Sequence, residues 1–323
     1  MTRDHGGNLD FALARFGGRL EDWIDLSTGI NRRPYPVPTL EPRHWNALPS
    51  QSDIASLHET ARQAYSARAS VLAVAGAQAA IQLLPRLAPA GRARVLAPTY
   101  NEYVPVLGDA GWQVEDVHEI DELAGADLAV AVNPNNPDGR QHDPARLLAL
   151  LSRVKRLVVD ESFADAVPQV SLATETGRAG LVVLRSFGKF YGLAGLRLGF
   201  VLGGEADVTA LTAMAGPWPI SGAAIAIGEK ALRDRDWADA TRARLEKDSL
   251  RLDGLARGAG WKLIGGTPLF RLYDVGDAAV AQERLARVHI WSRIFKDQPH
   301  WLRLGLPGDE SEWTRLTAAL SAR

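Results

Sequence analysis

The sequence predicts an α/β fold, a three-layer arrangement around a mostly parallel sheet, with a smaller α+β domain. The chain has 323 residues, more than one average domain. The apolar runs at 128–132, 157–159 and 181–184 are continuous, as in strands buried on both faces of a parallel sheet. Helical patterns such as 144–154 separate such runs, as expected for strand-helix-strand units.

Composition limits the class of protein. Hydrophobic residues make up 46% and charged residues 23%, which is ordinary for a globular chain. A net charge of -1 favours neither a nucleic acid nor a membrane surface as partner. The chain has no cysteine, which excludes disulfides and thiolate metal sites, and we expect no metal. No apolar stretch is long enough to span a bilayer and the start lacks an apolar signal core, so we expect a cytoplasmic enzyme.

The first segment, 1–45, is expected to be an arm that packs with the smaller domain. It contains the stretch His5-Gly6-Gly7-Asn8, a short helix at 9–16, and several prolines that keep the chain extended. His5 is a candidate site residue, although it could equally lie in a disordered terminus. Residues 46–205 are expected to form the large domain, and 206–323 a linker helix and the small domain.

Two early strands end in candidate binding groups. The run 71–74 leads into Gly76-Ala77-Gln78, where a strand changes to a helix and backbone amides favour an anion. The run 94–97 leads to Tyr100, whose ring could cover a flat ligand. The glycine could also serve helix packing alone, and Tyr100 could be an ordinary packing residue.

Three further strands deliver polar groups at their ends. Asn136 follows the run 128–132, Asp160 follows 157–159, and Lys189 follows 181–184. In parallel sheets ligands bind at the carboxyl ends of the strands, so an amide, a carboxylate and an amine are predicted to converge. Taken singly, Asp160 could be a helix N-cap and Asn136 a turn residue.

Lys189 lies in the glycine-rich segment 186–200. A lysine at the mouth of a buried strand is partly desolvated, which lowers its pKa and frees its amine to form a Schiff base with a carbonyl. Ser186 and Arg197 could hold a phosphate nearby. Pyridoxal phosphate carries both an aldehyde and a phosphate, so it is the candidate ligand. The alternative is that Lys189 is an ordinary surface lysine in a loop.

The C-terminal third is expected to begin with a long helix, from 222 to about 257, that has a charged face and links the two lobes. Strands at 261–264, 269–273, 290–294 and 301–306, with a helix at 278–288, then make a compact α+β lobe. Arg303 lies in an otherwise apolar strand, where a cation needs a buried partner or an anionic substrate.

The ordered motifs resemble those of fold-type I pyridoxal-phosphate enzymes, the class I/II aminotransferase superfamily. The resemblance covers nearly the whole chain and includes Ser-x-x-Lys at 186–189, Gly-x-Arg-x-Gly at 195–199, Pro-Trp-Pro at 217–219 and Trp-Leu-Arg at 301–303. Within the superfamily, the chain is similar to the branch of histidinol-phosphate aminotransferases and of the threonine-phosphate decarboxylases of cobalamin biosynthesis. The opening motif at 5–8 and the stretch Asp-Leu-Ser-Thr-Gly-Ile-Asn at 25–31 favour the decarboxylases.

The resemblance implies a role for each candidate residue. Lys189, Asp160 and Tyr100 are the expected catalytic residues, with Asp160 at the ring nitrogen and Tyr100 stacked on the ring. The cofactor pyridoxal 5'-phosphate is expected to be bound by Gly76, Ala77, Gln78, Tyr100, Asn136, Asp160, Ser186, Lys189 and Arg197. The substrate, a phosphorylated amino acid, is expected to be bound by His5, Gly29, Ile30, Arg293 and Arg303.

The implied reaction is decarboxylation of L-threonine O-3-phosphate to (R)-1-aminopropan-2-ol O-2-phosphate, by a protein that is expected to be a homodimer. An aminotransferase of the histidinol-phosphate type is the alternative, and a cofactor-binding protein without turnover is a second one. The sequence departs from the superfamily in two places. Phe163 stands where relatives usually have a tyrosine near the ring oxygen, and Leu48 stands where they have one that reaches the neighbouring subunit.

Overall fold

The computed structural model describes residues 5–321, which form two compact units. The larger unit consists of Tyr35–Asn136 and Gln141–Ala238, and the smaller one contains the chain before Tyr35, Pro137–Arg140 and the chain from Asp239 onward. The larger unit includes α8 (Glu205–Ala215), which packs on the large sheet, and α9 (Gly222–Arg233), which packs on α3 (Gln51–Ala64).

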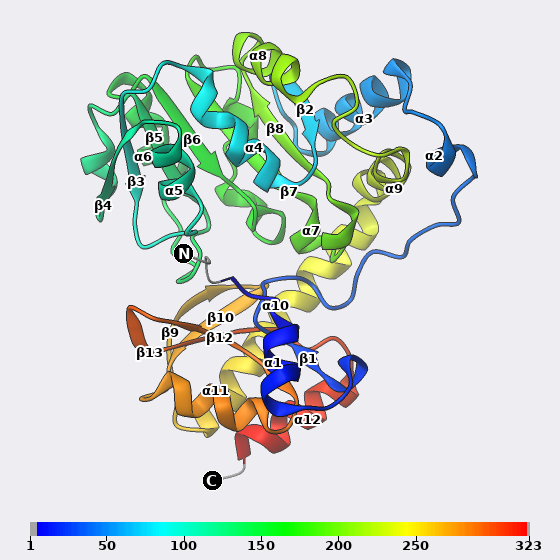
Figure 1. Ribbon diagram of the computed structural model, residues 1–323, viewed down its shortest axis with the longest axis vertical. Coiled ribbons are helices and arrows are strands. Elements are labelled where there is room, and N and C mark those ends of the chain that lie inside the picture. Colours follow the sequence, from blue (N-terminus) through cyan, green and yellow to red (C-terminus); the bar gives the residue numbers. More distant parts are fainter. Residues whose placement is uncertain (1–4, 322–323) are drawn as a thin grey trace. The chain divides into compact units, whose positions relative to one another are not determined.

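A seven-stranded sheet forms the centre of the larger unit (Figure 1). In spatial order its strands are β2 (Ser70–Val74), β8 (Gly199–Gly203), β7 (Leu181–Ser186), β6 (Arg156–Asp160), β5 (Leu128–Val132), β3 (Arg92–Leu96) and β4 (Gln113–Val117). Only β8 runs against its neighbours, and all other paired strands in the sheet are parallel. The prediction of a mostly parallel α/β sheet is confirmed.

The buried strands follow from their apolar residues. Every residue of β5 and β7 is buried, and β6 is buried from Leu157 to Asp160, so these strands lie inside a sheet covered on both faces. The strand β4 was not predicted, because its residues Gln-Val-Glu-Asp-Val are mostly exposed. It lies at the edge of the sheet beside β3, where polar residues are tolerated.

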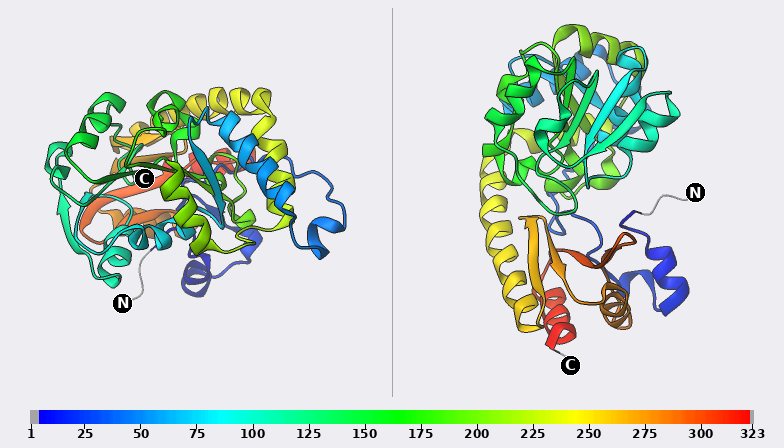
Figure 2. Two further views of the ribbon diagram at one scale, coloured as in Figure 1. Left: turned by 90° about the horizontal axis from the view of Figure 1, so that it is seen from above. Right: turned by 90° about the vertical axis from the view of Figure 1, so that its left-hand side faces the viewer.

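Helices lie on both faces of this sheet (Figure 2). Besides α3, α8 and α9, the larger unit contains the helices α2 (Arg43–Asn46), α4 (Ala77–Leu83), α5 (Tyr103–Asp109), α6 (Pro144–Ala149) and α7 (Phe187–Phe190). Capping residues fix several of their starts. The Ser50 side chain accepts from the Asp53 amide at the start of α3, and Ser221 accepts from the Ala224 amide at the start of α9.

The predicted long helix at 222–257 is wrong in one respect, because it is two helices. The helix α9 ends at Arg233, and α10 (Arg235–Gly258) begins after Asp234. The Asp234 carboxylate accepts the Trp237 amide at 3.0 Å and the Tyr35 hydroxyl at 3.1 Å. A side chain that binds the backbone in this way starts a new helix instead of continuing the old one.

The smaller unit is built on a four-stranded antiparallel sheet. Its strand order is β12 (Arg293–Phe295), β13 (Gln298–Gly305), β10 (Phe270–Asp274) and β9 (Lys262–Thr267). The helices are α1 (Leu9–Phe16), α11 (Ala278–Ala286), α12 (Glu310–Ser321) and most of α10.

The N-terminal segment packs within the smaller unit. The strand β1 (Ile24–Asp25) pairs in parallel with β11 (Ile290–Trp291), and Ala12 of α1 shares an apolar cluster with Trp23 and Ala286. Among residues 5–321, no helix is both long enough and apolar enough to cross a membrane.

Candidate active site

A pocket at the carboxyl ends of the central strands brings the expected cofactor residues together. All of its lining residues belong to the larger unit. The nine that the sequence singled out are Gly76, Ala77, Gln78, Tyr100, Asn136, Asp160, Ser186, Lys189 and Arg197. The prediction that separate strand ends deliver polar groups to one place therefore agrees with the geometry of this pocket.

Strand register explains why these groups meet. Val132 of β5 stands beside Asp160 of β6, and the Asn133 amide donates to the Asp160 carbonyl at 2.8 Å. The strand β7 follows β6 in the sheet and ends at Ser186, directly before the short helix α7 that carries Lys189. Parallel strands of similar length thus end at the same edge, which sets the amide, carboxylate and amine side by side.

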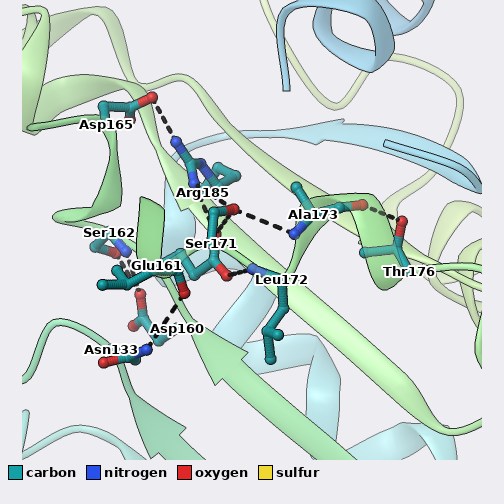
Figure 3. Close-up of polar contacts among 11 residues, drawn as sticks. Asn133, Asp160, Glu161, Ser162, Asp165, Ser171, Leu172, Ala173, Thr176 and Arg185 are labelled. Atoms are coloured by element: carbon teal, nitrogen blue, oxygen red, sulfur yellow. Dashed lines mark hydrogen bonds and ion pairs between the residues drawn. The ribbon is translucent and has the colours of Figure 1, made fainter. Parts of the chain in front are cut away.

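Asp160 is a buried and firmly held carboxylate, only 3% exposed. Its Oδ1 accepts the amide of Ser162 at 2.9 Å and the hydroxyl of the same residue at 2.5 Å (Figure 3). Its Oδ2 accepts the Tyr103 hydroxyl at 2.7 Å. Burial raises the pKa of the Tyr103 phenol well above its usual range, and the Asp160 charge adds to this, so the phenol remains a neutral donor.

Tyr100 is anchored by a chain of side chains at the pocket wall. Its hydroxyl donates to Oε1 of Gln78 at 3.2 Å, and Nε2 of Gln78 donates to the Glu102 carboxylate at 2.9 Å. The Tyr100 ring stands edge-on to the Tyr103 ring, with the centroids 6.4 Å apart. The ring is therefore fixed by contacts at its hydroxyl and at one edge.

Gly76 and Arg197 form another part of the pocket wall. A methyl group on Gly76 would lie 2.7 Å from Nη2 of Arg197, and Gly76 itself has φ of +79°. The guanidinium therefore lies directly against the backbone where β2 turns into α4. Arg197 has a left-handed backbone conformation and donates from Nη1 to the Ala194 carbonyl at 2.9 Å. A cation, backbone amides and the Ser186 hydroxyl, which all line this pocket, suit a phosphate group.

Lys189 extends over an aromatic ring. Its Nζ lies 5.7 Å from the centroid of Phe163, a buried residue that also lines the pocket. Stacked rings hold the helix around Lys189. The Tyr191 ring stacks on the Phe187 ring, with the centroids 4.2 Å apart, and on the Trp237 ring, with the centroids 5.5 Å apart. Such packing limits the movement of the segment that carries the amine.

Two arginines expected to bind the substrate lie together in the smaller unit. Arg293 of β12 pairs with Arg303 of β13 in the antiparallel register. Arg303 is buried, donates from Nη2 to the Ser27 carbonyl at 2.8 Å, and lies 5.0 Å from the Phe270 ring centroid. Burial lowers the pKa of Arg303 and the Arg293 charge lowers it further, whereas Asp25 raises it. Binding of an anion here would offset the repulsion between the two guanidinium groups.

The remaining expected substrate residues belong to the N-terminal segment of the same unit. His5 is exposed, Gly29 is buried and Ile30 is half-buried. The Ser27 carbonyl that binds Arg303 lies two residues before Gly29, so the segment is tied to the arginine pair. Leu48, which stands at one of the two departures from the superfamily pattern, is 67% exposed and belongs to the larger unit.

The donor set of the pocket fits pyridoxal phosphate. It offers a cation with hydroxyl and amide donors for a phosphate, a buried carboxylate for a ring nitrogen, an aromatic side wall and a primary amine. Within residues 5–321, no group of three or more histidine, aspartate or glutamate side chains is placed to hold a metal ion.

Sequence reasoning missed two groups that support Asp160. Tyr103 lies in α5 and reads as a core aromatic residue, which it also is. Ser162 lies two residues after the carboxylate that it binds, a spacing typical of turns and therefore easily overlooked. The Tyr103 contact carries no sequence signal, because it joins residues 57 positions apart, whereas the local spacing of Asp160 and Ser162 is a signal that could have been used.

Comparison with known proteins shows the family of the chain and proteins of similar sequence and fold. The model of the family "Aminotransferase class I and II" matches residues 45–320. The chain is 46% identical over 325 residues to threonine-phosphate decarboxylases from a Sinorhizobium species and from Pseudomonas aeruginosa, in each case covering 98% of this chain and 97% of the relative. Its fold is similar to that of histidinol-phosphate aminotransferase from Sinorhizobium meliloti in complex with pyridoxal-5'-phosphate, with a TM-score of 0.80 and 19% identity, over 92% of this chain and 89% of that one.

Proposed function

We propose, from the premise that the chain belongs to the class I and II aminotransferase family, that it is a pyridoxal-phosphate-dependent threonine-phosphate decarboxylase. The observation that carries this proposal is the 46% identity to threonine-phosphate decarboxylases over nearly the full length of both chains. The pocket supports the cofactor, because its nine expected residues lie together in one unit. We expect the product to serve cobalamin biosynthesis, as the resemblance implies.

The reaction removes the substrate carboxylate as carbon dioxide and adds a proton to Cα, which leaves aminopropanol phosphate. Bound pyridoxal phosphate supplies an electron sink that stabilises negative charge at Cα while the bond to the carboxylate breaks. The Asp160 carboxylate, which Ser162 and Tyr103 hold in place, would keep the ring nitrogen of the cofactor protonated. Arg197 and Ser186, which line the same pocket, would hold the cofactor phosphate.

Lys189 is the amine proposed to hold the cofactor covalently and to move a proton at Cα. Its Nζ stands over the Phe163 ring, in a wall without a hydroxyl at that position. Arg303 and Arg293 are proposed to bind the anionic groups of the substrate, with the segment of His5, Gly29 and Ile30 beside them. The choice of substrate is assigned to these anion-binding residues.

Two assays separate decarboxylation from transamination. With phosphothreonine as substrate, we expect release of carbon dioxide and aminopropanol phosphate. With histidinol phosphate and 2-oxoglutarate, we expect no glutamate. Formation of glutamate without release of carbon dioxide would instead identify an aminotransferase. Reduction with borohydride should fix the cofactor on Lys189, and a protein that binds the cofactor but does neither reaction would be a non-catalytic binder.

A cytoplasmic homodimer is also part of the proposal. The larger unit exposes four large apolar side chains near its N-terminal part and the 216–219 loop, namely Val37, Trp45, Leu48 and Trp218. Exposed apolar side chains of this size favour a protein interface. Sedimentation analysis should find a dimer that Trp45→Glu converts to a monomer, and a monomeric unaltered protein would contradict this part. The lack of cysteine suits a reducing compartment.

A further inference from the structure

Arg185 is a cation at the end of β7 that the proposed function leaves unused. It is only 3% exposed and precedes Ser186, the last residue of the strand. It stands among carboxylates that come from the end of β6 and the turn after it (Figure 3). A buried guanidinium needs partners, and here the partners Glu161 and Asp165 come from the segment that follows the neighbouring strand β6.

Two carboxylates bind the two ends of the Arg185 fork. Nη1 donates to Oε2 of Glu161 at 2.7 Å, and Nη2 donates to Oδ1 of Asp165 at 2.5 Å. Glu161 also accepts the hydroxyl of Ser171 and the amide of Leu172. The network therefore joins β7, the end of β6 and the segment around 171 in one buried unit.

The charges in this network depend on one another. Burial alone would lower the pKa of Arg185, but Asp165 and Glu161 together raise it above its ordinary value. Burial raises the pKa of Glu161, and the Arg185 guanidinium opposes that rise. The guanidinium also lies 4.4 Å from the centroid of the Tyr65 ring. Removal of the cation would leave two carboxylates in an apolar environment.

The network lies one residue away from the pocket on both strands. Glu161 follows Asp160, and Arg185 precedes Ser186, while Asp160 and Ser186 both line the pocket. Side chains of consecutive strand residues point to opposite faces of the sheet. The Glu161 amide donates to the Leu184 carbonyl at 2.9 Å, so the two strands are still paired at this level. We call the ion pairs of Arg185 with Glu161 and Asp165 the clamp; it lies next to the pocket residues Asp160 and Ser186 in the chain.

We propose that Arg185 is a positioning residue, which holds the ends of β6 and β7 in one register through Glu161 and Asp165. The clamp fixes the distance between the Asp160 carboxylate and the segment of Ser186 and Lys189. Buried ion pairs contribute little to stability compared with apolar replacements, but they can select one arrangement over others. This inference rests on the proposed function, because it concerns the placement of groups that bind the cofactor.

Titration of the cofactor-free protein with pyridoxal phosphate tests the clamp. For Arg185→Met we expect the dissociation constant to rise at least about tenfold and the visible absorption band of the bound cofactor to shift. Glu161→Gln is the second variant, because Arg185 keeps its pair with Asp165 and the protein is expected to fold. For this variant we expect a rise of about threefold or more.

Arg156→Met is the matched control. Arg156 stands at the other end of β6 and makes a two-pronged pair with Asp207, with contacts of 3.1 and 2.6 Å. Its loss should lower the unfolding midpoint and leave the dissociation constant within about twofold of the unaltered value. Cofactor binding by Glu161→Gln within that same range would overturn the clamp. So would an equal loss of binding in Arg156→Met and Arg185→Met at equal stability.

The two proposals fail in different ways. If the unaltered protein binds no pyridoxal phosphate, the proposed function is wrong and the clamp falls with it. If the unaltered protein binds the cofactor, is labelled on Lys189 by borohydride and releases carbon dioxide, the function stands. In that case only the comparison of the Arg185, Glu161 and Arg156 variants decides on the clamp.

Discussion

The Tyr103 hydroxyl donates to Oδ2 of Asp160 at 2.7 Å, and both side chains are buried. The bond joins the helix after β3 to the end of β6, and it holds Oδ2 of the carboxylate, whereas Ser162 holds Oδ1. A hydrogen bond to a charged group contributes more than a neutral one, and more so away from water. Asp160 therefore has a set orientation before any ligand arrives.

Tyr103→Phe is expected to lower the free energy of unfolding of the cofactor-free protein by about 1.5–3 kcal/mol, the range for a hydrogen bond to a charged group. It should also weaken binding of pyridoxal phosphate, since Asp160 loses one of its anchors. Urea unfolding and cofactor titration measure the two effects.

Tyr273→Phe is a close control for this prediction. The Tyr273 hydroxyl donates to Asp253 at 2.7 Å, but both residues belong to the smaller unit. This variant should lose similar stability and keep its cofactor affinity. A Tyr103→Phe protein that binds the cofactor as tightly as the control would show that the bond does not serve the site.

Gly76→Ala is expected to weaken cofactor binding, because the added methyl group meets the Arg197 guanidinium at 2.7 Å. The φ of +79° adds backbone strain of about 1–3 kcal/mol for any other residue. Gly195→Ala in the Lys189 segment is the comparison, since nothing lies within 4 Å of its new methyl group. Titration of both variants with pyridoxal phosphate should separate them, and equal affinities would contradict the close approach of Arg197.

Lys189→Ala should abolish labelling by borohydride and lower carbon dioxide release by at least about 100-fold, as expected for loss of a group that transfers protons. Lys155→Ala provides the control. Its side chain is 81% exposed and pairs with Asp127 at 2.7 Å, so activity should be unchanged. Mass spectrometry of the reduced protein identifies the labelled lysine, and labelling of a different lysine would refute the assignment.

Much of this site could be predicted from the sequence, because the patterns that indicate it consist of residues close together in the chain. An apolar run followed by a polar residue predicts both a buried strand and the group at its end, as for Val132 with Asn136 and Val159 with Asp160. The glycine-rich segment around Lys189 carries its signal in a few consecutive residues.

Contacts between distant segments could not be predicted in the same way. The pairing of Arg185 with Glu161 depends on the neighbourhood of β6 and β7, which the sequence order alone leaves open. The break at Asp234 was hidden by residues of good helix propensity on both sides, and its capping carboxylate is also held by the Tyr35 hydroxyl, which is 199 positions away. Tertiary partners decide such positions.

A substitution of Arg303 is expected to weaken substrate binding without changing cofactor binding. Arg303→Lys should raise the KM for phosphothreonine about tenfold or more, because a lysine cannot reproduce the two-pronged recognition of a carboxylate. Its cofactor affinity should stay unchanged, since the described residues that line the cofactor pocket all belong to the larger unit. Arg287→Lys, at an exposed ion pair with Glu283, is the control for steady-state kinetics. An unchanged KM in Arg303→Lys would exclude this arginine from substrate binding.

His58, which does not line the cofactor pocket, is expected to make the stability of the protein depend on pH. Its Nε2 accepts the Ala73 amide of β2 at 3.0 Å, and burial lowers the pKa of the imidazole below its ordinary 6.5. Between this lowered value and 6.5 the unfolded chain binds more protons than the folded one, so stability must fall as the pH falls through that window.

The slope can reach about 1.4 kcal/mol per pH unit for one such group. His58→Gln keeps a side-chain acceptor for the Ala73 amide but does not titrate, so its unfolding free energy should change less between pH 7.5 and 5 (about the window in which a histidine titrates). Urea unfolding of both proteins at several pH values gives the difference directly. If both proteins lose stability equally on acidification, groups other than His58 cause the loss, and the buried neutral imidazole does not control the stability of β2.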